Sequence, residues 1–515
     1  MGQLTSLDYA VVAGYLLVVL LVCVRVIRRA PDADELFLAG RTLGWGVVGL
    51  SLFASNISST TLIGLPGAAW ESGIAVANYE WMAALILVVS LVFVVPLFIG
   101  NRLTTVPELL ERRFDHRLRK YLSAVSVVLG IFLDASGSLF AGALVLQVFF
   151  PGLSLGLACA GIAGFAGLYT AAGGLRAVAY TDVLQGLVLI GGSIILSVIL
   201  FGQFDYSWSK VVAAVPADRL SLFRPIDDPH LPWLGTLIGL PILGFYYWTM
   251  NQYVAQRLLG ARSLDAAGWG AVLAATLKLL PLFLMVLPGV MAGALLTDLA
   301  RPDEVFPRMV AQYAPAGVAG LILAGLLAAI MSSVDSALNS SSTLLTLDFI
   351  RPRYPDLSVR QLGSLGRFLT LALVAIAALW APSIGDFPGL FAYLQEGFTY
   401  AATPLVGAFL VALMSRRIGA TPAFLGTVAG HAFSIAWLVA THLGYVDLHF
   451  TITAGVLLAV TIAAIYLIHF IRPQAVSASQ LTTVDFSRMP RLSQPLKWAC
   501  AGVMLLTAML VFQFR

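Results

Sequence analysis

Long apolar stretches follow one another along all 515 residues of the chain, and most are about as long as a bilayer is thick. A transmembrane helix needs about 20 consecutive, mainly apolar residues. Several stretches exceed this length, which predicts tilted or interrupted helices. The sequence therefore predicts an all-α integral membrane protein with about 14 transmembrane helices. These helices are expected at residues 7–27, 43–70, 77–99, 119–149, 153–171, 180–203, 231–250, 264–296, 315–346, 364–382, 385–413, 418–442, 449–470 and 496–513.

The composition excludes most classes of soluble protein. Charged residues make up 11% of the chain, against about 25% in ordinary soluble domains, and hydrophobic residues make up 59%. Because so few charges could not cover a water-exposed surface, we expect the lipid bilayer of the cytoplasmic (cell) membrane to surround the chain. A cytosolic enzyme, a nucleic-acid-binding protein and a disulfide-stabilised secreted domain are excluded, and no obligate protein partner is evident.

The distribution of basic residues predicts the orientation of the helices. Loops rich in Lys and Arg stay on the cytoplasmic side of a membrane. With the N-terminus outside, the cytoplasmic loops and helix ends hold 23 of the 30 basic residues, and the outer segments hold 6. The remaining basic residue, Lys278, falls within a span. Both termini are therefore expected on the outer side.

Ionisable side chains occur inside several of the apolar stretches. Glu80, Asp134, Lys278 and Asp335 lie well within spans, and Asp182 lies near the inner end of another. A charge at that depth costs several kcal/mol and normally faces the bundle interior or a water-filled cavity. These residues predict a polar path through the bundle.

Two spans contain sequences that disfavour a continuous helix. In the second span, residues 54–61 are small or polar except for Ile57, and such side chains offer the backbone alternative hydrogen bonds. The seventh span contains Gly239, Pro241 and Gly244. Interrupted helices in corresponding positions of two halves are typical of inverted-repeat transporters, where the unwound backbone lines a cavity.

Several short motifs occur in and around these regions: Phe37–Arg41, Ala54–Ser58, Tyr79–Trp81, Tyr180–Gln185, Asn251–Tyr253, Met331–Ser333 and Tyr393–Glu396. In combination they are similar to motifs of the sodium/solute symporter family, and most similar to its sodium/glucose cotransporter branch. The resemblance implies a LeuT-type five-plus-five inverted repeat in spans two to eleven. One extra span (1–36) would precede a transport core (37–415) with repeats at about 43–203 and 231–413, and three spans (416–515) would follow.

The resemblance also implies a site for Na⁺ as the transported coupling ion. Its ligands would be the backbone carbonyls of Ala54, Ile57 and Ala329 and the hydroxyls of Ser332 and Ser333. This set is chemically suitable, because hard cations prefer oxygen ligands. Residues 329, 332 and 333 have the spacing that places side chains on one helix face. The alternative for each serine is a hydrogen bond to its own helix.

A second cation site is implied by some relatives of other specificity. It would use Asp182, Asp335 and Ser336. The alternative is that Asp335 is structural and pairs with a cytoplasmic arginine such as Arg351.

The substrate site implied by the resemblance brings polar and aromatic side chains together. Carboxylate, ammonium and amide groups suit the hydroxyls of a sugar, because each unpaired buried hydroxyl costs about 1–3 kcal/mol. Glu80 and Lys278 could instead be a buried ion pair that fixes helix packing. Gln395 could serve only to form a hydrogen bond between helices, and the aromatic residues could serve only in packing. The expected substrate-binding residues are Asn56, Thr61, Glu80, Tyr247, Trp248, Lys278, Phe391 and Gln395.

Four positions depart from the pattern of the sugar-transporting branch. Thr61 replaces a glutamine, Gly244 an asparagine and Ala83 a serine, which removes three hydrogen-bonding groups. Asp134 stands where the branch has Asn or Lys. These changes indicate a substrate other than glucose, such as a smaller polyol, a cyclitol, a sugar acid or a cationic organic solute.

We therefore expect a sodium-coupled secondary active symporter, and not an enzyme. It would import a small hydroxylated solute, most simply a monosaccharide or polyol, by alternating access. The alternative is a sodium- or proton-coupled symporter for another organic solute, such as an amino acid, a carboxylate or sialic acid. A proton could then be carried by Asp134 or Asp335. The sequence contains no His-Glu-x-x-His or Walker motif.

Overall fold

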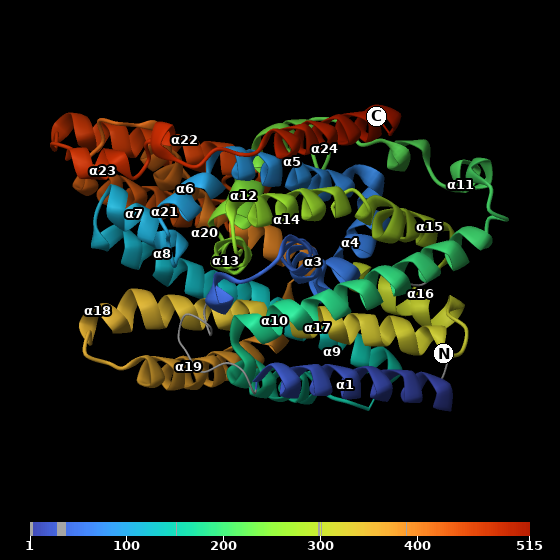
Figure 1. The fold of residues 1–515 in the computed structure, drawn as a ribbon. Helices are drawn as coiled ribbons and strands as arrows, with labels where there is room; N and C mark the ends of the chain where they lie inside the picture. The colour runs from blue at the N-terminus through green and yellow to red at the C-terminus, as the bar shows by residue number, and fades with distance from the viewer. Residues whose placement is uncertain are drawn as a thin grey trace.

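The computed structural model describes residues 4–27, 38–150, 152–296, 299, 301–387 and 389–514. Within these residues the chain is helical apart from its connections and one isolated β-bridge between Leu43 and Ala261. Most of the long helices lie side by side along one direction (Figure 1). This architecture confirms the predicted all-α class. The helices are α1 (Ser6–Ile27), α3 (Trp45–Asn56), α4 (Ser59–Ser72), α5 (Ala77–Phe93), α6 (Val95–Gly100), α7 (Val106–Arg113), α8 (His116–Leu129), α9 (Ser136–Phe149), α10 (Leu155–Gly202), α11 (Trp208–Ala214), α12 (Trp233–Phe245), α13 (Gln252–Leu259), α14 (Leu264–Leu277), α15 (Leu287–Leu295), α16 (Val305–Tyr313), α17 (Val318–Leu344), α18 (Arg351–Arg353), α19 (Val359–Trp380), α20 (Leu390–Met414), α21 (Ala420–His442), α22 (Phe450–Ile471), α23 (Ala478–Thr482) and α24 (Gln494–Gln513).

In the described part of the chain, ten helical segments are long and apolar enough to cross a membrane. Two shorter apolar helices, Ser6–Leu21 and Leu155–Gly167, fall in the expected first and fifth spans. The expected second and seventh spans are divided into short pieces, and the second half of span two continues with span three in Ser59–Phe93. The predicted count of 14 is therefore not confirmed, because interruptions shorten the helices.

The predicted interruption of the second span is present. Helix α3 ends at Asn56, Ile57 leaves the helical conformation with φ −74° and ψ 70°, and α4 begins at Ser59. Ser58 stabilises the new helix as its N-cap, since its hydroxyl accepts a hydrogen bond of 3.2 Å from the Thr61 N–H. The discontinuous helix thus arises where small polar residues compete for backbone groups.

The second interruption lies further along the chain than the sequence predicts. Helix α12 continues through Gly239 and Pro241, a π-helical turn follows at Tyr246–Met250, and extended backbone at Asn251 precedes α13. Gly239 has a packing role instead, since an added Cβ would lie 2.1 Å from the Thr451 carbonyl oxygen. The glycine allows α12 and α22 to approach each other closely and does not break the helix.

The predicted boundary between the fifth and sixth spans is also different. The chain is helical without interruption through α10, including residues 172–179, where a connection was expected. A straight helix of 48 residues would extend about 72 Å, more than twice the thickness of the hydrocarbon core. This helix therefore contains enough chain for both expected spans.

The N-terminal helix is attached to the centre of the bundle by one carboxylate. Asp8 Oδ1 accepts hydrogen bonds from the backbone N–H groups of Gly317 and Gly320, at 2.8 and 2.7 Å. These groups lie at the start of α17, where N–H groups lack partners within the helix. The contact fixes α1 beside α17; the expected boundary of the N-terminal span at residues 36–37 lies outside the described residues.

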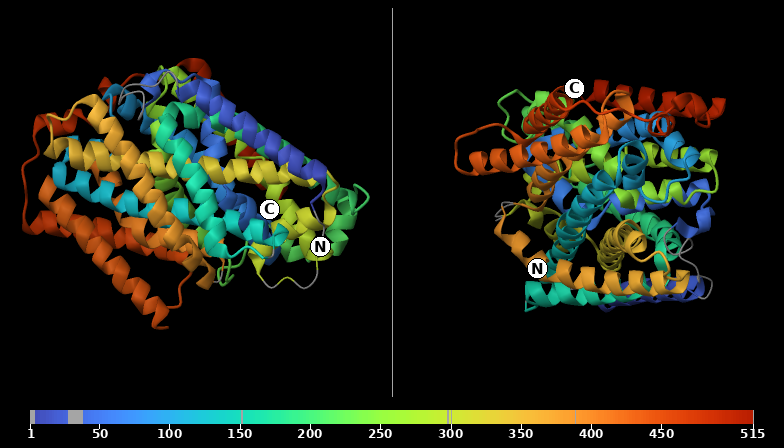
Figure 2. Two further views of the ribbon diagram at one scale, coloured as in Figure 1. Left: turned by 90° about the horizontal axis from the view of Figure 1, so that it is seen from below. Right: turned by 90° about the vertical axis from the view of Figure 1, so that its left-hand side faces the viewer.

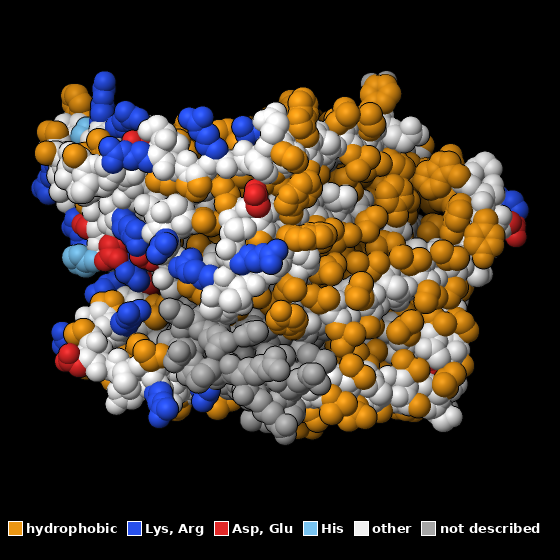
Figure 3. Space-filling view, viewed as in Figure 1, with side chains coloured by type: hydrophobic (Ala, Val, Ile, Leu, Met, Phe, Trp, Pro, Cys, Tyr) orange, Lys and Arg blue, Asp and Glu red, His pale blue; other side chains and the backbone are white. Residues whose placement is uncertain are grey.

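Burial and charge divide the bundle into a centre, an edge and a basic end. Helix α17 is central, because 78% of its apolar, membrane-length stretch is buried inside the bundle. The corresponding share is 22% for α22 and for α24. The C-terminal helices, coloured orange to red, lie along the edge (Figure 2). Lys and Arg side chains gather at the left-hand end of the face in Figure 3, while both termini lie toward the opposite end in Figure 1.

Candidate functional site

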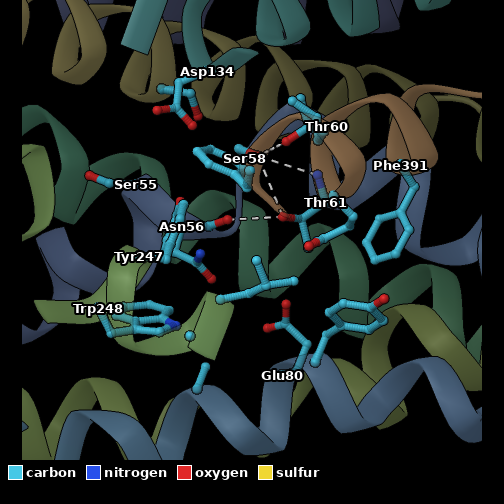
Figure 4. A pocket seen from close by; sticks show the side chains of 18 of the residues that line it. Ser55, Asn56, Ser58, Thr60, Thr61, Glu80, Asp134, Tyr247, Trp248 and Phe391 are labelled. Carbon is cyan, nitrogen blue, oxygen red and sulfur yellow. Dashed lines mark hydrogen bonds between the residues drawn. The ribbon is translucent and has the colours of Figure 1, made fainter. Parts of the chain in front are cut away.

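A cavity of about 120 Å³ lies beside the interruption between α3 and α4. Helices α5, α9, α12, α13, α17 and α20 and the two π-helical turns at Gly130–Ala135 and Tyr246–Met250 contribute the rest of its wall. Figure 4 shows the polar side chains from several elements converging on this space. The structure brings together most of the expected substrate residues here. Those that line the cavity are Asn56, Thr61, Glu80, Tyr247, Trp248, Phe391 and Gln395.

The interruption itself supplies the polar wall of the cavity. The Thr61 hydroxyl donates a hydrogen bond of 2.9 Å to the Asn56 carbonyl, which has no helical partner at the end of α3. Asn56 Oδ1 is buried and has no hydrogen-bond partner within the described chain. Ser58 and Thr60 also line the cavity and contact each other. These two residues were not in the expected set, although their position in the polar segment could have identified them.

Glu80 and Lys278 form an ion pair. Lys278 is fully buried, and its Nζ atom lies 5.3 Å from the centre of the Trp248 ring. Only the carboxylate partner lines the cavity, so Lys278 reaches the site through Glu80 and not directly. The pair balances the charge of Glu80 and fixes its position. Whether Lys278 contacts substrate stays a prediction.

Aromatic rings close two sides of the cavity. Tyr247 packs edge-on against Trp248, with 5.3 Å between the ring centres, and its side chain lies next to Asn56. On the other side Tyr79 packs edge-on against Phe391 at 5.0 Å. Tyr79 and Phe391 also line a second, larger cavity of about 950 Å³. This aromatic pair therefore separates the two spaces.

The second cavity is rich in carboxylates. It opens among the segments that the distribution of basic residues predicts to be outside. Asp228, in the loop before α12, has its pKa raised by burial, but hydrogen bonds from the Leu231 N–H, the Arg224 guanidinium and the His230 N–H outweigh this effect and hold the pKa below its usual value. The acidic residues that line this cavity are Glu71, Asp227, Asp228, Asp303, Glu396 and Asp447.

The expected sodium ligands gather where α17 packs against the interrupted helix. The carbonyls of Ala54 and Ile57 belong to the end of α3 and the following turn, where carbonyls lack intrahelical donors. The Ser333 hydroxyl donates a hydrogen bond of 2.8 Å to the carbonyl of Ala329, four residues earlier in its own helix, which is the alternative expected for a serine. Ser333 also lines the substrate cavity. The Ser332 hydroxyl lies 3.5 Å from that of Ser55 in α3 and donates to Asp182; its role stays a prediction.

Asp182 is the centre of a buried polar cluster. Arg257 Nη2 lies 2.9 Å from Asp182 Oδ2 and 2.6 Å from the Ser336 hydroxyl, and its Nε donates to Ser51 at 2.6 Å. Ser55 also donates to Asp182, at 3.2 Å. The sequence analysis missed Arg257, Ser51 and Ser55. Burial would have identified Arg257, but only the folded chain shows that every residue of α13 is buried.

The groups expected at a second cation site are only partly assembled. Ser336 donates hydrogen bonds to the Ser332 carbonyl and, at 3.2 Å, to Asp335 Oδ1. Asp182, however, already has the guanidinium of Arg257 as its counter-charge. A sodium ion at this point would have to compete with the Arg257 guanidinium, so the second site stays a prediction.

Asp134 lies in the π-helical turn Gly130–Ala135 and lines the cavity opposite Glu80 (Figure 4). The side chain of Asn251, at the second interruption, hydrogen-bonds to its carboxylate. Its Oδ2 atom is buried and has no partner within the described residues. The second interruption thus contacts this carboxylate.

Comparison with known proteins agrees with this geometry. The profile of the sodium:solute symporter family matches residues 36–430, more than half of the chain. The chain belongs to the sodium:solute symporter family. This membership confirms the predicted family, the prediction of transport and not catalysis, and sodium as the coupling ion.

The sequences of related cotransporters align with most of the chain. The sodium/mannose cotransporter SLC5A10 of Bos taurus is 34% identical over 475 residues, which are 85% of this chain and 79% of the relative. The sodium/glucose cotransporter of Vibrio parahaemolyticus is 34% identical over 465 residues, 84% of this chain and 85% of the relative.

Two solved transporter structures have folds similar to that of this chain. A Na⁺-coupled sialic acid symporter, in a substrate-bound outward-open state, superposes with a TM-score of 0.80 at 25% identity, over 92% of this symporter and 100% of the other chain. The nucleobase-cation symporter Mhp1 superposes with a TM-score of 0.58 at 15% identity, over 92% and 99% of the two chains, and supports the fold alone. The predicted LeuT-type fold with discontinuous helices is confirmed.

Proposed function

We propose that this symporter couples the entry of sodium to the uptake of a small hydroxylated solute of the monosaccharide or polyol class. The main support is the composition of the cavity wall. Asn56, Thr61, Glu80 and Gln395 offer both hydrogen-bond donors and acceptors around one space. Sodium/mannose and sodium/glucose cotransporters among the relatives point to the same class of solute.

The aromatic residues are suited to hold a sugar ring. The rings of Tyr247 and Trp248 offer apolar faces to its C–H groups, while polar residues satisfy its hydroxyls. Phe391 and Tyr79 stand between the binding cavity and the larger outer cavity, as a gate would. We assign the larger cavity as the route by which solute enters from outside.

Sodium and solute share one structural element, and this explains how they are coupled. Ala54 and Ile57 offer carbonyls to the ion, and Asn56, between them, faces the solute cavity. An ion bound by the carbonyls stabilises one conformation of the interruption, and the same conformation positions Asn56 for the solute. Coupling of this kind is reciprocal, so each ligand increases affinity for the other.

The domain division and the orientation belong to this proposal. An extra span (1–36), a transport core (37–415) and three further spans (416–515) fit the matched region, 36–430. The gathering of basic side chains at the end opposite both termini supports external termini in a cell membrane (Figure 3). Labelling of cysteines introduced at each terminus by an impermeant reagent on whole cells tests the orientation.

The function is tested by uptake into proteoliposomes that contain the purified protein. Accumulation of a radiolabelled hexose or polyol should require an inward sodium gradient and should stop when choline replaces sodium at fixed pH. Accumulation that persists in choline but requires a proton gradient would favour the proton-coupled alternative. Sodium-driven uptake of an amino acid or sialic acid, with no uptake of sugars, would contradict the proposed solute class.

A further inference from the structure

The cavity contains two carboxylates, and they have different partners. Glu80 forms an ion pair with Lys278. Among the described residues, Asp134 has no ion-pair partner, and its Oδ2 atom has no hydrogen-bond partner. Figure 4 shows the two carboxylates on opposite sides of the space that a solute would occupy.

The surroundings of Asp134 are polar but neutral. Its carboxylate contacts the amide of Asn251, which also accepts a hydrogen bond of 3.2 Å from the Tyr253 N–H through its Oδ1 atom. Among the described residues that line the cavity, none is Lys, Arg or His. The described cavity wall therefore supplies no counter-charge for an ionised Asp134.

Burying an ionised carboxylate without a counter-charge costs free energy. A positively charged ligand can supply the missing counter-charge. A neutral sugar hydroxyl would satisfy the free oxygen with one hydrogen bond but would leave the charge unbalanced. An ammonium group would do both, because it donates up to three hydrogen bonds and carries a positive charge. The hydroxyl and amide groups elsewhere in the wall still suit a hydroxylated ring.

The approach to the cavity favours a cation as well. The outer cavity, which Tyr79 and Phe391 separate from the inner one, is lined by six carboxylates and three histidines. One of the carboxylates, Asp228, is paired with Arg224. Carboxylates that line a cleft raise the local concentration of positively charged ligands. The same acidic approach would disfavour a sugar acid.

We propose that the solute is a hydroxylated amine of the amino-sugar type, whose ammonium group forms an ion pair with Asp134. This inference rests on the proposed function and names its solute class more closely. Glu80 with Lys278, Asn56 and Gln395 bind the ring hydroxyls, and Asp134 distinguishes the amine from the neutral sugar of the same shape.

The test compares three sugars that share one ring: glucosamine, N-acetylglucosamine and glucose. Sodium-driven uptake of each is measured in proteoliposomes at neutral pH, where much of the amine is protonated and a carboxyl group is less protonated than in acid. The wild type should prefer glucosamine by at least about tenfold in kcat/KM, which corresponds to about 1.4 kcal/mol. Asp134→Asn keeps the shape of the side chain and removes the charge, so this preference should disappear while the sodium dependence remains.

The matched control is Asp356→Asn, the same change at an exposed loop residue, which should keep the wild-type preference. Equal preference for the three sugars in the wild type and in Asp134→Asn would overturn the inference but leave sodium–sugar symport intact. If Asp134→Asn changes the sodium half-saturation equally for all three sugars, Asp134 acts on sodium and not on the amine, and the inference is also overturned. Sodium-independent uptake of glucose that requires a proton gradient and Asp134 would show that this residue carries a proton. Absence of sodium-driven uptake for every sugar would contradict the proposed function itself.

Discussion

Arg257 and Asp182 form an ion pair deep in the bundle, with 2.9 Å between Nη2 and Oδ2, and both side chains are at most 1% exposed. The Ser51 hydroxyl bridges them: it accepts from Arg257 and donates to Asp182 at 2.5 Å. Arg257 lies in α13, after the second interruption, and Ser51 lies in α3, before the first. The pair therefore links the two interrupted helices to α10.

This ion pair should contribute strongly to folding. Arg257→Leu leaves the Asp182 carboxylate buried without a counter-charge, which should cost about 3–5 kcal/mol of stability. The double variant Asp182→Asn/Arg257→Leu removes both charges and should recover much of this loss. Thermal unfolding in detergent measures both effects. A single variant as stable as the wild type would contradict the structural role of the pair.

Sodium and solute binding should respond to different substitutions. Ser333→Ala removes a hydroxyl ligand and should raise the sodium half-saturation by about tenfold, the equivalent of about 1.4 kcal/mol. Gln395→Ala removes an amide from the solute cavity and should mainly raise the solute half-saturation. Initial uptake rates at varied sodium and varied solute separate the two. Unchanged sodium dependence in Ser333→Ala would argue against the proposed ion site.

Asp303 should make stability depend on pH. It lies between α15 and α16, outside the membrane-spanning helices, and its carboxylate accepts a hydrogen bond of 3.2 Å from the Leu390 N–H. Burial raises its pKa; the Leu390 N–H and Arg301 lower it, and Glu71 and Glu304 raise it further, so the net shift is upward.

Because this pKa is raised in the folded state, folding is favoured while Asp303 is protonated, and the advantage is lost as pH rises through the folded-state value. Asp303→Asn cannot ionise and still accepts a hydrogen bond. The variant should therefore unfold at a higher temperature than the wild type at neutral pH, and the difference should close near the usual Asp pKa of about 4. A difference that is constant between pH 4 and 7 would contradict this assignment.

Gly239 should be intolerant of a side chain. An alanine Cβ would lie 2.1 Å from the Thr451 carbonyl oxygen, so α12 and α22 would have to separate. Gly239→Ala should lower the melting temperature by several degrees, because forced overpacking costs about 1–3 kcal/mol. Gly161→Ala is the control, since nothing lies within 4 Å of its added Cβ. Equal melting temperatures for the two variants would show that the helices can adjust.

The sequence alone determined the solvent, the helical class and the residue types at the site. Charge scarcity and apolar stretches of bilayer length leave a helical membrane bundle as the stable solution, because unpaired backbone groups are too costly in lipid. The position of the first interruption could also be predicted, since small polar residues at 54–61 compete locally for backbone hydrogen bonds.

The tertiary structure decided which polar groups meet, because contacts between distant helices depend on packing and not on local preference. Because Gly239 is a glycine, the sequence predicted a helix break there. In the structure the close approach of α22 accounts for the glycine, and the second interruption lies at Asn251. The same limit hid the partner of Asp182, which lies 75 residues away in α13. The sequence offered a Glu80–Lys278 ion pair only as an alternative, and the folded chain contains it. Asp134 faces the cavity with no ion-pair partner among the described residues, and this difference in pairing is the basis of the proposed solute.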